Sequence, residues 1–200
     1  MKPVEELEIT EEDREKARLV FEKNFEPPKT DEEIFYELCF CICAPQTTFK
    51  NNIKVIEELK VHDLFNREMS IDILERILKP VRFYHNKAKW VMNAKANFSE
   101  VLDMVKSKWV PEVKRVWLKK DVKGLGYKAA SHFLRNLGCK DLAIIDTHIL
   151  KFLKIEGKWN YDDLERRLGD IADSEGLTVA ELDIIIWKYY SKTPWENYTY

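Results

Sequence analysis

Apolar residues recur at spacings of three and four along almost the whole chain, which is typical of amphipathic α-helices. A threonine followed three residues later by an acid opens three of these segments, at Thr10, Thr30 and Thr178, as in a capping box. The pattern predicts helices from Thr10 to just before Pro27, over 33–44, 47–60, 70–79, 84–98, 111–120, 127–137, 147–156 and 161–175, and from Thr178 to the end of "ELDIIIWKYYS".

Strand signals are scarce. The apolar run "LAII" at 142–145 is short and leads directly into a predicted helix. We therefore expect an all-α fold of two helical lobes with a cleft between them. One lobe would comprise residues 1–45 and 130–200, and the other residues 46–129.

The composition is that of an ordinary globular protein. The 200 residues are 45% hydrophobic and 34% charged, which is enough for a sizeable core. The longest apolar runs, such as "LDIIIW", are too short to cross a bilayer, and no cleavable signal opens the chain. We expect a cytoplasmic monomer without membrane contact. Its four cysteines, three of them in "CFCIC", should be free thiols, because their spacing fits neither a zinc nor an iron–sulfur site.

Charge is distributed unevenly, although the net charge is only −2. Residues 1–37 hold thirteen acids and six bases, whereas residues 104–140 hold ten bases and two acids. This asymmetry indicates a positive face that could meet a polyanion. A solvated helix surface is the alternative interpretation.

The stretch "VKGLGYKAASHFLRNLG", residues 122–138, places a Gly-x-Gly turn before an apolar-faced helix. Gly124 and Gly126 would permit positive φ and a tight reversal, with Lys123 leading into the turn. Unpaired amides at such a turn and at the following helix start can hold a phosphate without reading sequence. A plain structural turn is the alternative.

Lys128 lies in the first turn of the helix after this hairpin, and Asp146 follows it by eighteen residues in "AIIDTHIL". Helix N-termini disfavour positive charge, so the position favours a neutral, nucleophilic amine. A carboxylate from Asp146 would then stabilise a cationic intermediate. The alternatives are a lysine that extends into solvent and an aspartate that only caps the next helix.

The hairpin and the aspartate segment together resemble the signature of the helix-hairpin-helix DNA glycosylase superfamily. With "ELCFCI", "RFYHNKA" and "ELDIIIW", the chain is most similar to the archaeal-type 8-oxoguanine DNA glycosylase/AP lyase family, over roughly residues 33 to 190. The resemblance implies a bifunctional DNA repair enzyme that excises 8-oxoguanine. Lys128 would attack C1′ of a flipped-out nucleoside, and Asp146 would stabilise the oxocarbenium-like sugar. A Schiff base on the lysine would then lead to strand cleavage by β-elimination.

The resemblance also implies a base pocket. His132, one turn after Lys128, would lie on one face of the damaged base, with Trp187 on the other face. Asp183 would lie at the base edge, where a carboxylate can accept from guanine N1–H and the exocyclic amine. Without the resemblance, these three are equally an interior histidine, a core tryptophan and a surface acid.

Further DNA contacts follow from the resemblance. Gln46 would enter the gap left by the extruded base, and Phe83 and Tyr84 would contact the orphaned base. Arg82 and Lys87 would contact a phosphate or the opposite base. The chain departs from the family's usual pattern in the loop "CAPQTTFKNN" and in a C-terminal "TPWENYTY", where the family typically ends in a lysine.

Two other functions are compatible with parts of the sequence. A glycosylase for oxidised pyrimidines of the endonuclease III kind usually carries a four-cysteine iron–sulfur motif, which this sequence lacks after Cys139. A non-catalytic helix-hairpin-helix DNA-binding module would need neither Lys128 nor Asp146. The expected partner is double-stranded DNA containing a damaged base, at the nucleoid. We expect no metal or organic cofactor in the reaction, and the hairpin is a candidate site for a structural monovalent cation.

Overall fold

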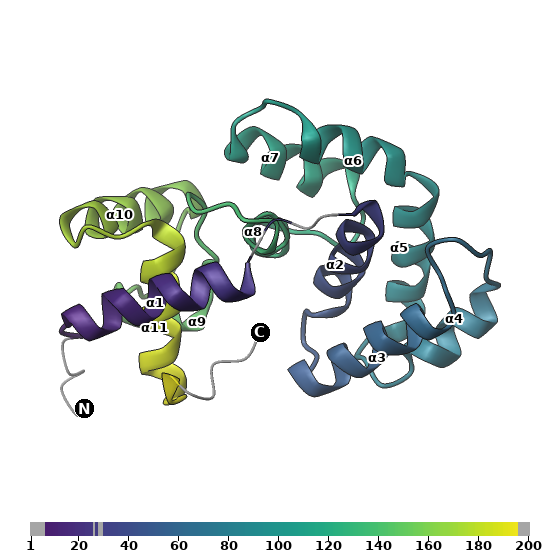
Figure 1. Cartoon of the computed structure of the whole chain (residues 1–200), viewed down its shortest axis with the longest axis horizontal. Helices are drawn as coiled ribbons and strands as arrows, with labels where there is room; N and C mark the ends of the chain where they lie inside the picture. Colours follow the sequence, from purple (N-terminus) through teal and green to yellow (C-terminus); the bar gives the residue numbers. More distant parts are fainter. Residues whose placement is uncertain (1–6, 26, 28–29, 196–200) are drawn as a thin grey trace. The chain divides into compact units, whose positions relative to one another are not determined.

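The computed structural model describes residues 7–25, 27 and 30–195. These residues form α-helices joined by turns and contain no β-strand, which confirms the all-α prediction (Figure 1). They divide into two compact units. One unit is made of the described parts of Met1–Pro27 and Arg135–Tyr200, and the other of the described part of Pro28–Leu134.

The unit within Pro28–Leu134 is built around α2 (Asp31–Cys43), which Thr30 and Glu33 open as the predicted capping box. Most side chains of α2 are buried, including Phe35 and Leu38, so this helix forms the centre of the unit. Its neighbours are α3 (Phe49–Val61), α5 (Tyr84–Ala96) and α6 (Phe98–Lys106) (Figure 1). The outer helices are α4 (Ile71–Leu78), against α3 and α5, and α7 (Pro111–Asp121), against α6.

The other unit is built around α11 (Val179–Ser191), which packs against α1 (Glu11–Asn24), α9 (Thr147–Phe152) and α10 (Tyr161–Ser174). Asp13 ties both ends of the chain into this unit, because its Oδ1 accepts from Lys188 Nζ at 3.4 Å and from Trp195 Nε1 at 3.3 Å. Burial raises the pKa of Asp13, but hydrogen bonds from Thr10 and the Lys188 cation outweigh it and lower that pKa overall.

The unit boundaries differ from the predicted lobes at α2. The sequence assigned residues 1–45 to the lobe of the chain ends, whereas α2 packs against α3 and α5 and so belongs with the central helices. The other boundary was predicted between residues 129 and 130 and falls between Leu134 and Arg135, later in the same helix, α8 (Tyr127–Asn136).

Two helices differ from the predicted pattern. The sequence predicted no helix between 98 and 111, yet α6 begins at Phe98, and Asn97 both ends α5 and precedes α6. The helix predicted over 147–156 ends at Phe152, because Lys154 adopts a left-handed φ of 54°. Among the described residues, no helix combines the length and the apolar composition needed to span a membrane.

Candidate functional site

The hairpin between α7 and α8 depends on one of its two glycines. Gly124 has a φ of +95°, and a Cβ there would lie 2.8 Å from Cε3 of Trp90, so neither conformation nor space admits a side chain. Gly126 would also permit a positive φ, but it does not adopt one. Its carbonyl accepts from Ala130 N at 2.9 Å, which starts α8, and no atom lies within 4 Å of a Cβ built there. A side chain at Gly126, where α8 starts, would therefore extend into open space.

Cations surround this turn. Lys119 Nζ lies 4.2 Å from the centroid of the Tyr127 ring and the Arg115 guanidinium carbon 5.5 Å from it, so α7 and α8 are held together through Tyr127. The lysines near the turn are exposed: Lys119, Lys120, Lys123 and Lys128. Four of the ten bases counted in residues 104–140 are thus exposed near this turn.

Lys128 lies in the first turn of α8, as predicted, and its side chain is exposed, as in the alternative interpretation of a lysine that extends into solvent. His132 follows one turn later and is half-buried. Its ring centroid lies 5.9 Å from that of Phe40 on α2, at an interplanar angle of 84°. This edge-to-face contact orients the imidazole against the unit's own core.

Asp146 belongs to the other unit and is the N-cap of α9. Its Oδ1 accepts from His148 N at 2.8 Å and from Ile149 N at 3.1 Å, and the residue is half-buried. The capping role predicted from the sequence is confirmed, and it holds the carboxylate in a defined orientation.

Asp183 and Trp187 lie on α11, in the same unit as Asp146. Trp187 is 37% exposed, whereas Asp183 is only 6% exposed and its Oδ2 accepts from Arg135 Nη1 at 2.7 Å. Nothing in the sequence predicts the pairing of Asp183 with Arg135, which are 48 positions apart. A contact between Asp183 and a base stays a prediction. To make this contact, a buried carboxylate that already binds an arginine would have to bind the base as well.

Two residues predicted to enter the duplex are held in left-handed backbone conformations. Gln46, with φ 56°, is the third residue of a turn in which Thr47 N donates to Ala44 O at 3.0 Å. A positive φ at that position after Pro45 is typical of a type II turn. Phe83, with φ 60°, precedes α5 and is 50% exposed. Both side chains are presented to solvent.

The neighbours of Phe83 are also aromatic or cationic. The Arg82 guanidinium carbon lies 4.8 Å from the Phe83 ring centroid, and the Tyr84 and His85 ring centroids are 4.0 Å apart. Arg82 is exposed and Tyr84 half-buried, so this segment presents a charge and flat rings together. Such surfaces suit a nucleic-acid backbone and its bases.

Lys87 differs from the prediction that it contacts a phosphate or the opposite base. It is 1% exposed, and its Nζ donates to Cys43 O at 2.7 Å, to Pro45 O at 2.7 Å and to Thr47 Oγ1 at 3.0 Å. Burial lowers the pKa of Lys87, although the Cys43 thiol acts in the opposite direction. Burial also raises the pKa of Cys43 to about 12. The ammonium is therefore part of the interior of its unit.

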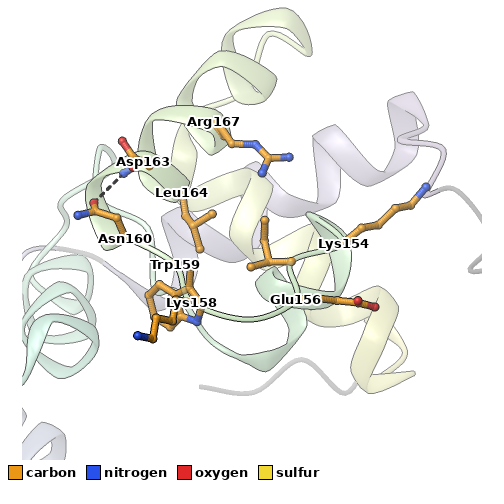
Figure 2. Close-up of a pocket in the computed structure, with 9 residues that line it drawn as sticks. Lys154, Glu156, Lys158, Trp159, Asn160, Asp163, Leu164 and Arg167 are labelled. Atoms are coloured by element: carbon orange, nitrogen blue, oxygen red, sulfur yellow. Dashed lines mark hydrogen bonds between the residues drawn. The ribbon is translucent and has the colours of Figure 1, made fainter.

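A pocket of about 710 Å³ opens beside α10, in the unit that also contains Asp146. Figure 2 shows its side chains, which come from the segment after α9 and from the start of α10. They include three bases, two acids and the 45% exposed Trp159. None of the predicted site residues lines it. In the described part of the chain, no group of three His, Cys, Asp or Glu side chains is placed to hold a metal ion.

Comparison with known proteins identifies the fold that carries these features. A family model described as 8-oxoguanine DNA glycosylase matches residues 16–172. The chain belongs to this family. Among curated members of the 8-oxoguanine DNA glycosylase family, the 8-oxoguanine DNA glycosylase/AP lyase of Methanocaldococcus jannaschii is 36% identical, with 94% of each chain covered. That of Korarchaeum cryptofilum is 32% identical over 82% of this chain and 83% of its own.

Solved structures of 8-oxoguanine DNA glycosylases show the same fold. The crystal structure of the M. jannaschii protein in complex with a 15mer DNA containing 8-oxoguanine has a TM-score of 0.73 and 34% identity, covering 91% of this chain and 89% of that one. The Thermotoga maritima 8-oxoguanine DNA glycosylase has a TM-score of 0.77 and 28% identity, covering 90% and 92%. The resemblance inferred from the hairpin and the aspartate segment is confirmed.

Proposed function

We propose that this protein removes 8-oxoguanine from double-stranded DNA and then cleaves the strand at the abasic site. The observation that carries the proposal is family membership over most of the chain, together with an exposed Lys128 at the open start of α8. The relatives it matches over more than four-fifths of their length are named for both activities. Its substrate is chromosomal DNA, which places it at the nucleoid in the cytoplasm.

In the mechanism we propose, the Lys128 amine attacks C1′ of the extruded nucleoside as the bond from C1′ to N9 breaks. The base leaves with the bonding electrons and takes up a proton. The amine loses its protons and the sugar ring opens, which forms an imine between Lys128 and C1′. Loss of a proton from C2′ then expels the 3′ phosphate and nicks the strand. The Asp146 carboxylate stabilises the positive charge that develops on the sugar.

The hairpin supports this chemistry by holding the backbone. Backbone amides at the start of α8 and the exposed lysines beside them bind phosphates without reading sequence. His132 and Trp187 would contact the two faces of the base. The monovalent cation at the hairpin remains a prediction of the sequence.

Borohydride trapping tests the nucleophile. Lys128→Gln should fold and bind DNA, yet form no covalent adduct with 8-oxoguanine duplexes and lose excision by about 10³-fold or more. Lys123→Gln, in the same hairpin, is the matched control and should still form the adduct. If Lys128→Gln is trapped or still nicks, another residue is the nucleophile. If the wild-type chain is trapped on thymine glycol in preference to 8-oxoguanine, its substrate is an oxidised pyrimidine, and no trapping on any substrate would indicate a binding module.

Asp146→Asn separates charge from structure at the second catalytic position. Asparagine is also a good N-cap, so Oδ1 can keep the hydrogen bonds from His148 N and Ile149 N while the negative charge is lost. We expect an unchanged free energy of unfolding and a fall in single-turnover excision of about 10²-fold. Full activity in Asp146→Asn would exclude an electrostatic role for this carboxylate.

A further inference from the structure

We propose that Lys87 is a positioning residue. It holds two inserts, the loop that contains Gln46 and the turn that contains Phe83, as one rigid pair. The exposed side chains of these inserts open the duplex at the lesion. The proposal rests on the proposed function, because both inserts act only on extruded-base DNA. It concerns the described residues of a single unit, Pro28–Leu134. Three features of that unit carry it.

The first feature is that the Lys87 ammonium has one acceptor for each of its N–H donors. A lysine has three N–H donors, and the three acceptors at Cys43 O, Pro45 O and Thr47 Oγ1 lie within 3.0 Å of Nζ. These acceptors lie on both sides of Gln46. They include the last residue of α2, where helix carbonyls lack partners and a cation is favourable. The loop cannot shift without leaving a buried ammonium unsatisfied, which is costly.

The second feature is a link from the same residue to the other insert. The backbone N of Lys87 donates to Phe83 O at 3.0 Å and so closes the first turn of α5. Asn51, in the first turn of α3, adds a second link, since its Nδ2 donates to Pro80 O at 3.1 Å in the segment that leads to Phe83. The two segments are therefore joined by two side chains that come from different helices.

The third feature is the backbone of the inserts themselves. Gln46 and Phe83 both have left-handed φ values, which residues other than glycine and asparagine rarely adopt. Such conformations persist only where the surroundings over-determine them, and they gather at functional sites. Here the surroundings are the Lys87 and Asn51 hydrogen bonds. What they hold in place is two exposed side chains, an amide and an aromatic ring.

The experiment compares Lys87→Met with Lys89→Met. Both variants lose one lysine charge from α5, but Lys89 is exposed, whereas Lys87 is buried. Insertion is measured with saturating protein on a duplex in which 2-aminopurine lies opposite a tetrahydrofuran abasic analogue, because its fluorescence rises when the base is unstacked. Cleavage is measured on 8-oxoguanine duplex and on single-stranded DNA with a true abasic site, which needs no insertion.

We expect Lys87→Met to lose most of the fluorescence rise and about tenfold or more of duplex excision, while single-stranded cleavage stays within about twofold of wild type. Lys89→Met should resemble wild type in all three assays. In a Gln46→Ala background, Lys87→Met should cause a smaller loss than in wild type, because one of the two side chains that it positions is already gone. Equal losses on both substrates, or an unchanged fluorescence rise, would overturn the positioning role.

Asn51→Ala decides the matter if Lys87→Met does not fold. It removes the second link at a half-buried position, and it should show the same split between duplex and single-stranded substrates at smaller amplitude. Absence of that split would overturn the proposal. The same assays distinguish failure of this proposal from failure of the proposed function. If the proposed function is wrong, the wild-type protein will cleave neither substrate, while the fluorescence assay still reports insertion.

Discussion

At the scale of single residues, the buried Cys43 thiol links the pH of the solution to stability. Burial raises its pKa to about 12, whereas a thiol in an unfolded chain ionises near about 8.5. Above that pH the unfolded chain releases a proton that the folded chain retains, so the free energy of unfolding falls as pH rises toward the folded value. The Cys43 contribution is therefore present below about pH 8.5 and is lost above it.

The measurement is urea unfolding of wild type and Cys43→Ala at about pH 8, 9 and 10. Wild type should lose stability more steeply than the variant, by up to about 1.4 kcal/mol per pH unit. The comparison isolates Cys43, because Cys39, which is also buried with a raised pKa, remains in both proteins. Parallel slopes would show that the thiol ionises equally in the folded and unfolded chains.

Residue roles in the candidate site could be predicted where the local sequence determines them. Lys128 follows a glycine turn and lies in the first turn of a helix, as predicted, and its side chain is exposed. Lys87 also precedes an alanine near the start of a helix, yet it is buried. Its acceptors include a carbonyl 44 residues earlier in the chain, so only tertiary packing distinguishes the two lysines.

At the scale of elements, the hairpin offers a matched pair of glycines. Gly124→Ala forces a positive φ on alanine and a Cβ against the Trp90 ring, so it should lower the free energy of unfolding by about 2 to 4 kcal/mol. Gly126→Ala meets no atom within 4 Å and should change stability by less than about 0.5 kcal/mol. It should nonetheless weaken DNA binding, because the methyl group adds bulk to the turn at which we propose that the phosphate binds. Chemical denaturation of both variants checks the contrast, and equal destabilisation would contradict it.

Helix boundaries could be predicted from the sequence where local side chains determine them. The capping boxes at Thr10, Thr30 and Thr178 all form with both of their hydrogen bonds, and the helices start where they predict. Helix α6 was missed because it begins directly after α5, with only Asn97 between them, and Asn97 makes no side-chain cap hydrogen bond. The end of α9 was placed too late, since lysine at a left-handed position carries no sequence signal of its own.

At the scale of the whole molecule, the two proposed catalytic groups belong to different units. Lys128 comes with the hairpin in the unit within Pro28–Leu134, and Asp146 comes with α9 in the unit built from both ends of the chain. That second unit depends on contacts between α1 and α11, which are far apart in sequence. Hydrophobic patterning predicts most of the helices but not which helices pack together, which explains why α2 was assigned to the other set of helices.

The charge distribution gives a prediction for the whole molecule. A net charge of −2 would suggest weak attraction to DNA, but four lysines in and beside the hairpin are exposed. Affinity for an abasic-analogue duplex should therefore fall with salt, with a slope of about −0.9 in log K against log salt for each phosphate neutralised.

Lys123→Gln should make this slope shallower by about 1. Lys16→Gln should leave it unchanged, because Lys16 lies in the acid-rich N-terminal segment, paired with Glu12 at 2.6 Å. Titrations by fluorescence anisotropy between about 50 and 200 mM salt measure the slopes. If Lys123→Gln and Lys16→Gln shift the slope equally, binding follows net charge rather than the hairpin.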